Sequence, residues 1–377
     1  MRTSKRTIEG VSGSDFHLGA NSVPTEQIVD GLNRLITNRP LFKDIDLAIF
    51  AGDVFDRLLP HPSMEAIRSR EWMDDTTKLA AEENVIIGIL EGTPMHDWRQ
   101  SRYFLETNVA MGNIADIRYA DVVKVEYIAP LGIHVLWVPD EAHPNCALTK
   151  IAVEKALLEA GVTEVDITVL HGQFRHQFPS HLHDTGIDFH DTEFYDRITR
   201  HFVFIGHIHH HSIYKKFVSH GSIERLHHGY ESPKGVVRFT LDLDNPKKSK
   251  CWFVENTSAK IFKTIKITGE DLNYEADNVR IAVANLPLGS AVRLEAVAEH
   301  PIHNLLSGFK REFPHFSWSS KYSKVKKIEK TRDLTERARR QRISIRRENL
   351  KALIEPKLDV HSPDLKQCVL KILEKCL

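Results

Sequence analysis

The sequence predicts a layered α/β core, followed by a small α+β unit and a helical C-terminal segment. Two observations predict this class. Short apolar runs alternate with amphipathic helical patterns over the first 255 residues, as expected when strands lie side by side in a sheet covered by helices. After that point the alternation changes, and the end of the chain is helical by composition. We expect domains at residues 1–255, 256–328 and 329–377.

Six apolar runs are the strand candidates of the core. Each is short, rich in β-branched or aromatic residues and followed by glycine or polar residues, which is typical of strands that end in loops. In chain order they are "IEGVSGSD", "DLAIFAGD", "NVIIGILEG", "GIHVLWVPD", "VDITVLHGQ" and "HFVFIGHIHH".

Helices are expected between these strands because apolar residues recur every three or four positions. The stretch "SMEAIRSREWMDDTTKLAAEEN" predicts a long helix, and "ALTKIAVEKALLEAG" predicts another that Gly161 ends. A third pattern, in "PTEQIVDGLNRLI", has an apolar stripe of Ile28, Leu32, Leu35 and Ile36.

The C-terminal third has a different pattern. "KIFKTIKITG", "VRIAVANLPLGSAVRLEAVAEHP" and a helical pattern near "IHNLLSGFKREF" predict a small α+β unit. The last stretch begins with Ser362 as a helix cap and Pro363 at the first helical position. Its apolar stripe comprises Leu365, Val369, Ile372 and Cys376. This stripe fits docking to a partner helix, or packing within its own chain.

The composition predicts the cellular compartment of the protein. Of the 377 residues, 41% are hydrophobic and 27% are charged, which is typical of a soluble globular protein. No apolar run approaches the roughly 18 residues that a membrane span needs, and "MRTSKRTIEG" lacks the apolar centre of a secretory signal. The four cysteines are scattered without a C-x-x-C pair, so neither a disulfide framework nor a zinc ribbon is predicted. We expect a cytoplasmic protein with no membrane contact.

Charge is balanced overall but not locally. The formal net charge is zero, with 51 basic and 51 acidic residues, so overall charge does not steer the chain towards nucleic acid. Residues 319–351 nevertheless hold thirteen Lys or Arg against four Asp or Glu. This excess fits either a solvated helical face or contact with a polyanion.

Side chains that can bind metal follow nearly every strand candidate of the first 210 residues. They are Asp15 and His17, Asp53 and Asp56, His96 and Asp97, His171, and His207 and His209. Open α/β sheets place their sites at the carboxyl ends of adjacent strands, so we expect these side chains to converge. Imidazoles with carboxylates suit manganese, iron or zinc, and one Asp can bridge two cations. Two such cations would predict phosphoester hydrolysis.

The order of these motifs resembles that of the calcineurin-like metallophosphoesterases, whose motifs run D-x-H, G-D-x-x-D, G-N-H-D/E, H and G-H-x-H. More narrowly, "SDFHLG", "AGDVFDR" and "HGSIERLHHGYESPKGVVRFTLD" resemble the nuclease subunit of the SbcCD-type DNA double-strand-break repair complex, viral relatives included. The resemblance implies a layered metallophosphoesterase β-sandwich flanked by helices. It also implies a DNA-contacting capping domain and a helical segment that binds the coiled-coil base of an ABC-type ATPase.

The resemblance also implies a role for each residue of the site. His96 would contact the scissile phosphate or assist the leaving group, which suits a side chain that titrates near neutral pH. Two divalent metal ions, expected to be manganese, would be bound by the other residues. The implied ligands are Asp15, His17 and His209 for one ion, His171 and His207 for the other, and Asp53 between them.

The loop "GTPMHD" departs from the family pattern. The asparagine whose carbonyl usually completes the second metal site is missing, and Met95 precedes His96 instead. A thioether is a poor ligand for a hard divalent cation. Thr93, a backbone carbonyl or water could fill the place in an active enzyme; alternatively, the site is degenerate and the protein is a scaffold. We expect an active enzyme because six other ligands and His96 are present.

These features predict a two-metal DNA nuclease that cuts duplex ends, hairpins or nicked strands and works with an ATPase partner. The alternatives are a phosphatase or cyclic-nucleotide phosphodiesterase of the same fold, and a catalytically silent scaffold that binds DNA ends. Duplex DNA is the expected substrate in the first case.

Two surfaces have alternative interpretations. The first surface, a group of lysines beside two aromatic rings, could contact the phosphates and exposed bases of a nucleic acid. Alternatively, its aromatic rings belong to the core of the small domain. This surface comprises Lys321, Lys324, Lys326 and Lys327 beside Trp318 and Tyr322. The second corresponds to the homodimer contact of the relatives, or else covers the sheet. It comprises Met64, Ile67, Trp72 and Met73.

Overall fold

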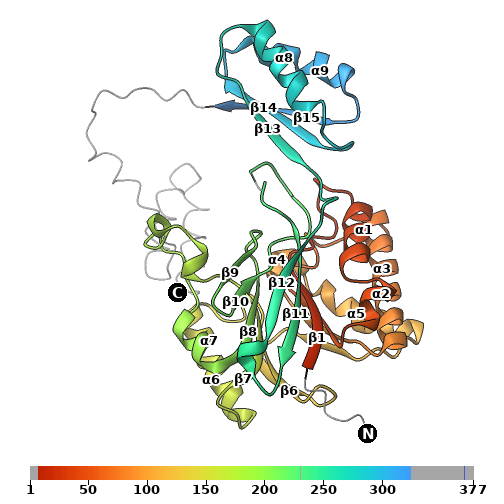
Figure 1. Cartoon of the computed structure of the whole chain (residues 1–377), viewed down its shortest axis with the longest axis vertical. Coiled ribbons are helices and arrows are strands. Elements are labelled where there is room, and N and C mark those ends of the chain that lie inside the picture. The colour runs from red at the N-terminus through yellow and green to blue at the C-terminus, as the bar shows by residue number, and fades with distance from the viewer. Residues whose placement is uncertain (1–6, 230, 324–368, 370–377) are drawn as a thin grey trace. The chain divides into compact units, whose positions relative to one another are not determined.

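The structure is a computed structural model that describes residues 7–229, 231–323 and 369. In this part of the chain, two six-stranded sheets pack face to face between two layers of helices (Figure 1). The predicted layered α/β class is therefore confirmed. The division into two sheets follows from the family resemblance and not from the strand pattern alone.

The first sheet is mixed. Strands β1, β2, β3 and β4 pair in parallel, and β11 pairs with β1 and β12 in antiparallel fashion. In spatial order the strands are β12 (Lys250–Glu255), β11 (Gly235–Asp242), β1 (Thr7–Gly13), β2 (Leu47–Ala51), β3 (Ile86–Leu90) and β4 (Ile117–Ala120).

The second sheet is also mixed, with β6, β7, β8 and β10 in parallel and antiparallel strands at both edges. In spatial order the strands are β5 (Lys124–Ile128), β6 (Ile133–Val138), β7 (Val165–His171), β8 (Thr199–Gly206), β10 (Phe217–Ser219) and β9 (Ser212–Tyr214). Because neighbouring parallel strands end at the same edge, each sheet presents several loops at one end.

The core between the sheets explains the continuous apolar runs of the central strands. Every residue of β2 and β7 is buried, as expected for strands that are covered on both faces. Gly88 of β3 lies under Trp137 of β6, and a Cβ at this position would come within 2.4 Å of the indole ring. The glycine thus allows the large buried ring to fill the space between the sheets.

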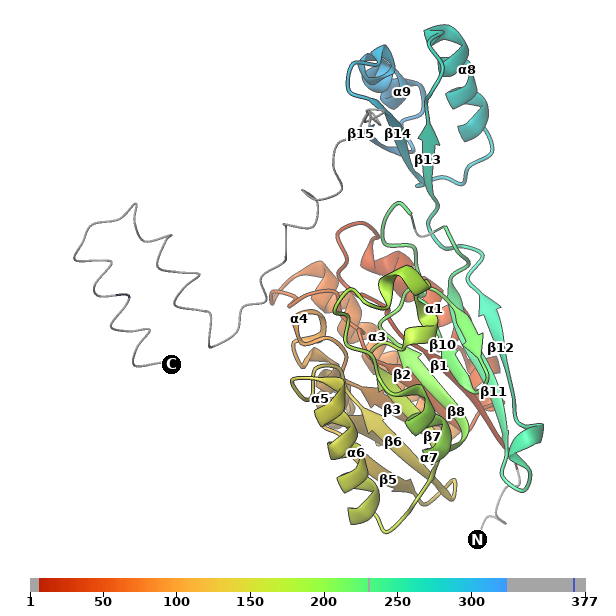
Figure 2. The ribbon, with the colours of Figure 1, turned by 90° about the vertical axis from the view of Figure 1, so that its left-hand side faces the viewer.

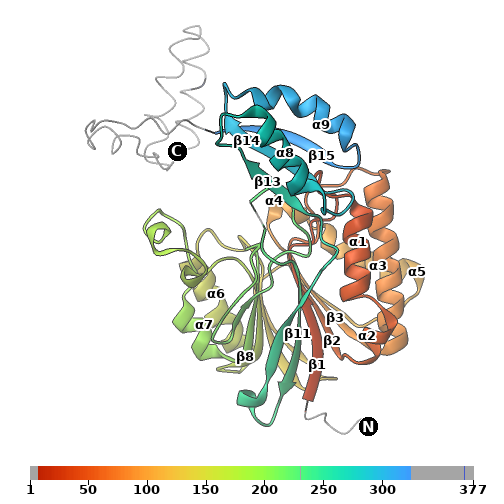
Figure 3. The ribbon, with the colours of Figure 1, turned by 45° about the horizontal axis from the view of Figure 1, so that its top comes forward.

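Helices cover the outer faces of both sheets (Figure 3). Against the first sheet, Trp72 packs on Phe50 with the ring centroids 5.8 Å apart. Four of the helices listed below begin after residues whose side chains cap them: Asn38, Ser63, Asn145 and Asp191. The helices are α1 (Thr25–Leu35), α2 (Arg39–Lys43), α3 (Met64–Glu83), α4 (Pro94–Asp97), α5 (Tyr103–Met111), α6 (Cys146–Glu159) and α7 (Thr192–Ile198).

Short 3₁₀ helices complete the regular structure of the described residues. They are η1 (Gln100–Arg102), η2 (Arg175–Gln177), η3 (Ser180–Leu182), η4 (Pro246–Lys248) and η5 (Pro301–Leu305). Within the described ranges, we find no helix that is both long enough and apolar enough to cross a membrane.

The small unit contains a three-stranded parallel sheet with two helices beside it (Figure 2). Its elements are β13 (Phe262–Lys266), α8 (Leu272–Val283), β14 (Ala291–Val297), α9 (Leu306–Glu312) and β15 (Ser317–Ser323). Trp318 is 7% exposed and stacks on Phe309 at 5.3 Å, so it belongs to the core of this unit and is not free to stack on a base. Tyr322, in contrast, is 64% exposed.

The domain boundaries at 255 and 328 stay predictions. The expected helices of residues 329–377 lie outside the described residues, Val369 excepted. In α3, Trp72 and Met73 are fully buried against the first sheet, whereas Met64 and Ile67 are 76% and 42% exposed. Only the last two remain available to a partner.

Candidate metal centre

Four of the predicted ligands have an unusual backbone conformation. Asp15, His17, Asp53 and His207 have positive φ angles of 53°, 53°, 50° and 90°. For residues with a side chain, this region costs roughly 1–3 kcal/mol and persists only where the surrounding structure enforces it. All four lie just after the ends of β1, β2 and β8. Since such strain concentrates at functional sites, it marks these three loops as parts of one site.

The loops that follow β1, β2 and β3 are bonded to one another. Asp15 N–H donates to Gly52 O at 3.0 Å, and His17 N–H donates to Asp53 O at 3.1 Å. A Cβ on Gly92 would lie 2.1 Å from Asp53 N, so a glycine is required for the third loop to approach this closely. These contacts hold the first two predicted motifs in a fixed relation.

Asp97 belongs to this framework. Its buried carboxylate accepts hydrogen bonds from Asp53 N at 3.1 Å, from Phe55 N at 2.9 Å and from Gly92 N at 2.7 Å. Among the described residues it is part of no group that could hold a metal ion. Asp97, which the sequence pattern selects as able to bind metal, instead positions the loop that carries Asp53.

Asp15, His17 and His209 form the first group that could hold a metal ion. One ligand atom from each lies within 4.8 Å of the others. His17 Nε2 is 3.0 Å from His209 Nε2, which in turn is 3.4 Å from Asp15 Oδ1. Two imidazole nitrogens and a carboxylate oxygen that converge in this way suit a divalent transition-metal ion.

Asp53, His171 and His207 form the second group, with ligand atoms again within 4.8 Å of one another. His171 Nδ1–H donates to Ala51 O at 2.7 Å, so the lone pair is on Nε2. That nitrogen is buried, has no hydrogen-bond partner among the described residues and lies 3.4 Å from Asp53 Oδ2. A metal-binding histidine commonly donates its other N–H to a carbonyl, so this arrangement fits a bound cation.

Asp53 lies between the two groups. Its Oδ2 is 3.4 Å from His171 Nε2 and 4.0 Å from His17 Nε2. The carboxylate therefore faces both groups, as a bridging ligand must. Through Asp53, the structure brings together all six residues that the sequence analysis selects as metal ligands.

Charge in the centre favours a cation. Burial alone would raise the pKa of Asp15, but the hydrogen bond and charge of His209, with the charges of His171 and His17, lower that pKa well below its usual value. Burial likewise raises the pKa of Asp53, but the charge of His171 lowers it to about 2. Both carboxylates are thus ionised at neutral pH, where a metal ion would bind.

His96 lies beside the first group and is partly exposed. Its Nδ1–H donates to Asp56 O at 2.8 Å, and its ring centroid is 5.0 Å from that of His17. Asp56 Oδ1 accepts a hydrogen bond from His17 Nδ1 at 3.0 Å. Carboxylates commonly orient metal-binding histidines in this way. This contact fits a positioning role for Asp56, whose role the sequence leaves open. Asp56, His17 and His96 also form a third group with ligand atoms within 4.8 Å of one another.

Thr93 occupies the place next to the second group in the loop "GTPMHD". Its Oγ1 lies 3.3 Å from Asp53 Oδ2 and 3.1 Å from Asp140 Oδ2. Met95 is 76% exposed and belongs to no candidate metal group among the described residues. Of the two side chains that the loop offers, Thr93 is therefore the one that faces Asp53.

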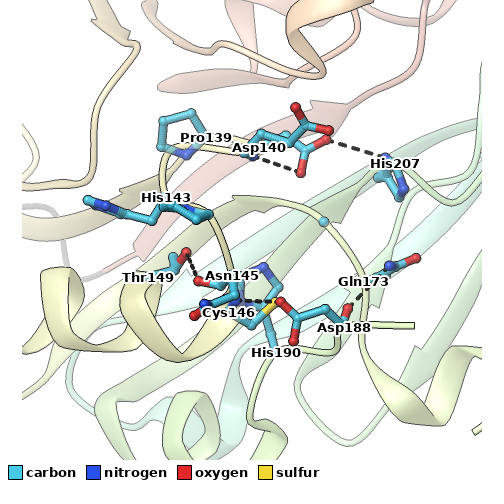
Figure 4. Close-up of a pocket in the computed structure, with 13 residues that line it drawn as sticks. Pro139, Asp140, His143, Asn145, Cys146, Thr149, Gln173, Asp188, His190 and His207 are labelled. Atoms are coloured by element: carbon cyan, nitrogen blue, oxygen red, sulfur yellow. Dashed lines mark hydrogen bonds and ion pairs between the residues drawn. The ribbon is translucent and has the colours of Figure 1, made fainter. Parts of the chain in front are cut away.

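Asp140 is a site residue that the sequence analysis does not select. It follows β6, and its Oδ2 lies 3.7 Å from His207 Nδ1 (Figure 4). The signal was present, because Asp140 ends the strand candidate "GIHVLWVPD" in the way that Asp15 and Asp53 end theirs. Asp140 belongs to none of the five family motifs, so the motifs alone do not identify it.

A cavity of about 270 Å³ opens beside the second group (Figure 4). His207 and Asp140 line it, together with Gln173, Asp188 and His190. Its wall therefore offers hydrogen-bond donors and acceptors directly next to the candidate ligands.

Comparisons with known proteins do not assign a family. No family model and no curated protein matches the chain. The solved structure of TT1561 of Thermus thermophilus is 14% identical, over 66% of this chain and 99% of that chain, with a TM-score of 0.36. A second solved structure is 12% identical, over 66% and 99%, with a TM-score of 0.37. These similarities do not show a family for this chain. Its layered α/β fold is compatible with a phosphoesterase fold, and the family stays a prediction.

Proposed function

We propose that this chain is a two-metal phosphodiesterase that cuts DNA. The observation that carries the proposal is the convergence of the six predicted ligands and His96 at the strand ends of both sheets. When bound, two divalent cations would polarise the phosphodiester and lower the pKa of the attacking water. Manganese is the proposed metal because it accepts mixed imidazole and carboxylate donors.

The protein would hold the two ions with the two groups described above. Asp15, His17 and His209 would bind one ion, and His171 and His207 the other, with Asp53 between them. Asp56 and Asp97 would keep His17 and Asp53 in place through the hydrogen bonds at 3.0 and 3.1 Å. This framework would leave the ligand geometry little freedom to relax before substrate binds.

His96 is the proposed catalytic residue. Because its Nδ1–H donates to Asp56 O, its Nε2 is left to face the substrate. In the charged ring, Nε2–H would donate to a phosphate oxygen or pass its proton to the leaving oxygen. Such a group contributes typically 10²–10⁴-fold, an order-of-magnitude range, to a proton transfer of this kind.

DNA is proposed as the substrate because of the family resemblance and the basic stretch of residues 319–351. Tyr322, which is 64% exposed, lies within the part of this stretch that the structure describes. The ABC-type ATPase partner, which would dock on residues 329–377, rests on the resemblance and on the apolar stripe of the last helix pattern. A homodimer through the exposed part of α3 is also proposed.

A nuclease assay tests the proposal. The purified chain in manganese should cut an end-labelled duplex and a DNA hairpin. His96→Ala should slow cutting by at least about 100-fold because the proton donor is lost. Manganese binding and the melting temperature should stay those of the wild type. His181→Ala, which changes an exposed histidine outside the site, is the matched control and should cut normally.

Two results would contradict the proposal in different ways. Hydrolysis of a p-nitrophenyl phosphoester with no cutting of DNA would indicate a small-substrate phosphatase. Binding of DNA ends without turnover in manganese, magnesium or zinc would indicate a scaffold.

A further inference from the structure

We infer that Asp140 is a ligand of the second metal ion and takes the place of the asparagine that the loop "GTPMHD" lacks. The inference rests on the proposed two-metal centre and deepens it. It concerns a residue outside every motif that suggested the function.

The register of the parallel strands places Asp140 next to the second group. Val138 of β6 and Ile205 of β8 both lie opposite Leu170 of β7, in parallel pairing. Each is followed two positions later by a polar side chain, Asp140 after β6 and His207 after β8. The two side chains therefore leave the same sheet edge, on either side of the strand that ends in a candidate ligand.

The carboxylate of Asp140 is held in one orientation. Its Oδ1 accepts a hydrogen bond from Glu141 N–H at 3.0 Å, and Glu141 has a left-handed φ of 47° that closes this turn. Its side chain is 15% exposed. The other oxygen, Oδ2, lies 3.7 Å from His207 Nδ1 (Figure 4). One oxygen is thus anchored by the backbone, and the other is presented to the second group.

The Thr93 hydroxyl lies near more carboxylate oxygens than it can donate to. It lies 3.3 Å from Asp53 Oδ2 and 3.1 Å from Asp140 Oδ2. A hydroxyl has one proton and can donate to only one of the two carboxylates. Two like-charged oxygens beside a single donor favour positive charge close to both, which a bound metal ion would supply.

Asp140 lies 3.7 Å from His207 but is not among the ligand atoms of the second group that are all within 4.8 Å of one another. A shift of its Oδ2 towards the ion would complete a four-ligand set. Asp53 and Asp140 supply two oxygens, and His171 and His207 supply two nitrogens, a donor set that suits manganese or zinc. A carboxylate offers the oxygen that an asparagine carbonyl would offer, and it adds a negative charge. Thr93 would then orient the two carboxylates and not bind the ion itself.

Manganese titration of the full chain tests the inference without any activity measurement. Calorimetry and metal counting after equilibrium dialysis should find two Mn²⁺ per wild-type chain. Asp140→Ala should weaken the second site by at least about 10-fold, since loss of even an outer partner of a metal ligand costs that much. Asp140→Asn keeps the shape and one neutral oxygen, so it should weaken the site less. Glu154→Gln, which changes an exposed carboxylate of α6 outside the site, is the matched control and should bind as the wild type does.

Electron paramagnetic resonance gives a second readout. The wild type should give the signal of a coupled manganese pair, and Asp140→Ala should give that of an isolated ion at the same metal concentration. Two ions bound by Asp140→Ala with wild-type affinity would overturn the inference. A wild type that binds fewer than two ions would overturn the two-metal centre as well. The expected binding results without cutting of DNA would overturn the nuclease proposal and leave the role of Asp140 standing.

Discussion

Buried histidines in this chain are either candidate metal ligands or hydrogen-bonded parts of the core, depending on the groups around them. His171 presents a buried Nε2 to the Asp53 carboxylate at 3.4 Å, so it can share a cation with that oxygen. His220 is equally buried but is satisfied by neutral groups. Its Nδ1–H donates to Ile205 O at 2.9 Å, and its Nε2 accepts from Ser12 Oγ–H at 2.7 Å. The first ring has a lone pair to offer to a metal, whereas burial favours the neutral form of the second, whose two nitrogens both have partners.

His220 predicts a loss of stability in acid. Burial lowers its pKa from 6.5 to about 4 despite the opposing charge of Asp15. Between these two pKa values the unfolded chain binds more protons at this residue than the folded chain, so its contribution is complete above pH 6.5 and is lost as the pH falls to about 4. The loss amounts to about 3 kcal/mol at most.

Urea unfolding at about pH 7 and about pH 4.5 measures this effect. His220→Gln should lose less free energy of unfolding between the two pH values than the wild type, because its side chain does not titrate. His181→Gln, at an exposed position, should behave as the wild type. An equal loss in His220→Gln and the wild type would refute the assignment.

Residue types after apolar strands were enough to predict which side chains converge but not the role of each. Asp15 and Asp53 were selected because a carboxylate in a D-x-H or G-D motif has a known place. Asp97 has the same chemistry, yet its partners are backbone N–H groups, and only the folded loops reveal that. Asp140 was missed because it belongs to no family motif, and only the fold shows that it lies beside His207. Partners brought together by strand register cannot be read from a local pattern.

At the scale of elements, the predicted strands became β1, β2, β3, β6, β7 and β8, and the predicted core helices became α1, α3 and α6. These were predictable because covered strands are continuously apolar and covering helices have one apolar stripe. Strands β9 and β10 have three residues each, too few for a pattern. Strand β12 alternates between exposed and partly buried residues, and its pairing depends on β11 beside it. Whether such short or marginal segments form strands depends on their neighbours in the sheet and not on local composition.

The exposed surface of α3 and α5 predicts a homodimer contact. Met64, Ile67, Val109 and Met111 are 76%, 42%, 80% and 60% exposed, and a cavity of about 330 Å³ lies between the two helices. Of these four side chains, Ile67 and Met111 line the cavity. Exposed apolar side chains around a groove are typical of a self-complementary interface. Ile67→Asp would place a charge in the contact and should raise the dimer dissociation constant by about 10-fold or more.

Sedimentation over a range of concentrations tests this interface. Ile281→Asp makes the same change on α8, where Ile281 is 73% exposed, and should leave the dimer intact. A wild type that stays monomeric at high concentration, or equal association of both variants, would show that this face of α3 is not the contact.

At the scale of the whole molecule, the candidate centre belongs to neither sheet alone. Asp53 follows β2 of the first sheet and His171 ends β7 of the second, yet their side chains are 3.4 Å apart. His171 is also bonded to Ala51 O, at the end of β2. The centre therefore forms only when the two sheets pack on each other, which couples metal binding to the folding of the core.

The proposed ATPase contact should be separable from this centre, because every candidate ligand lies before residue 210. Removal of residues 332–377 should abolish co-purification with the cognate ABC-type ATPase and leave the number of bound Mn²⁺ unchanged. In the full-length chain, Val369→Asp should weaken the same association by placing a charge in the apolar stripe. Glu374→Gln, beside the stripe, is the control and should leave the association intact. If the truncated chain still co-purifies with the ATPase, residues 332–377 do not form the docking segment; if it loses manganese, they contribute to the metal centre instead.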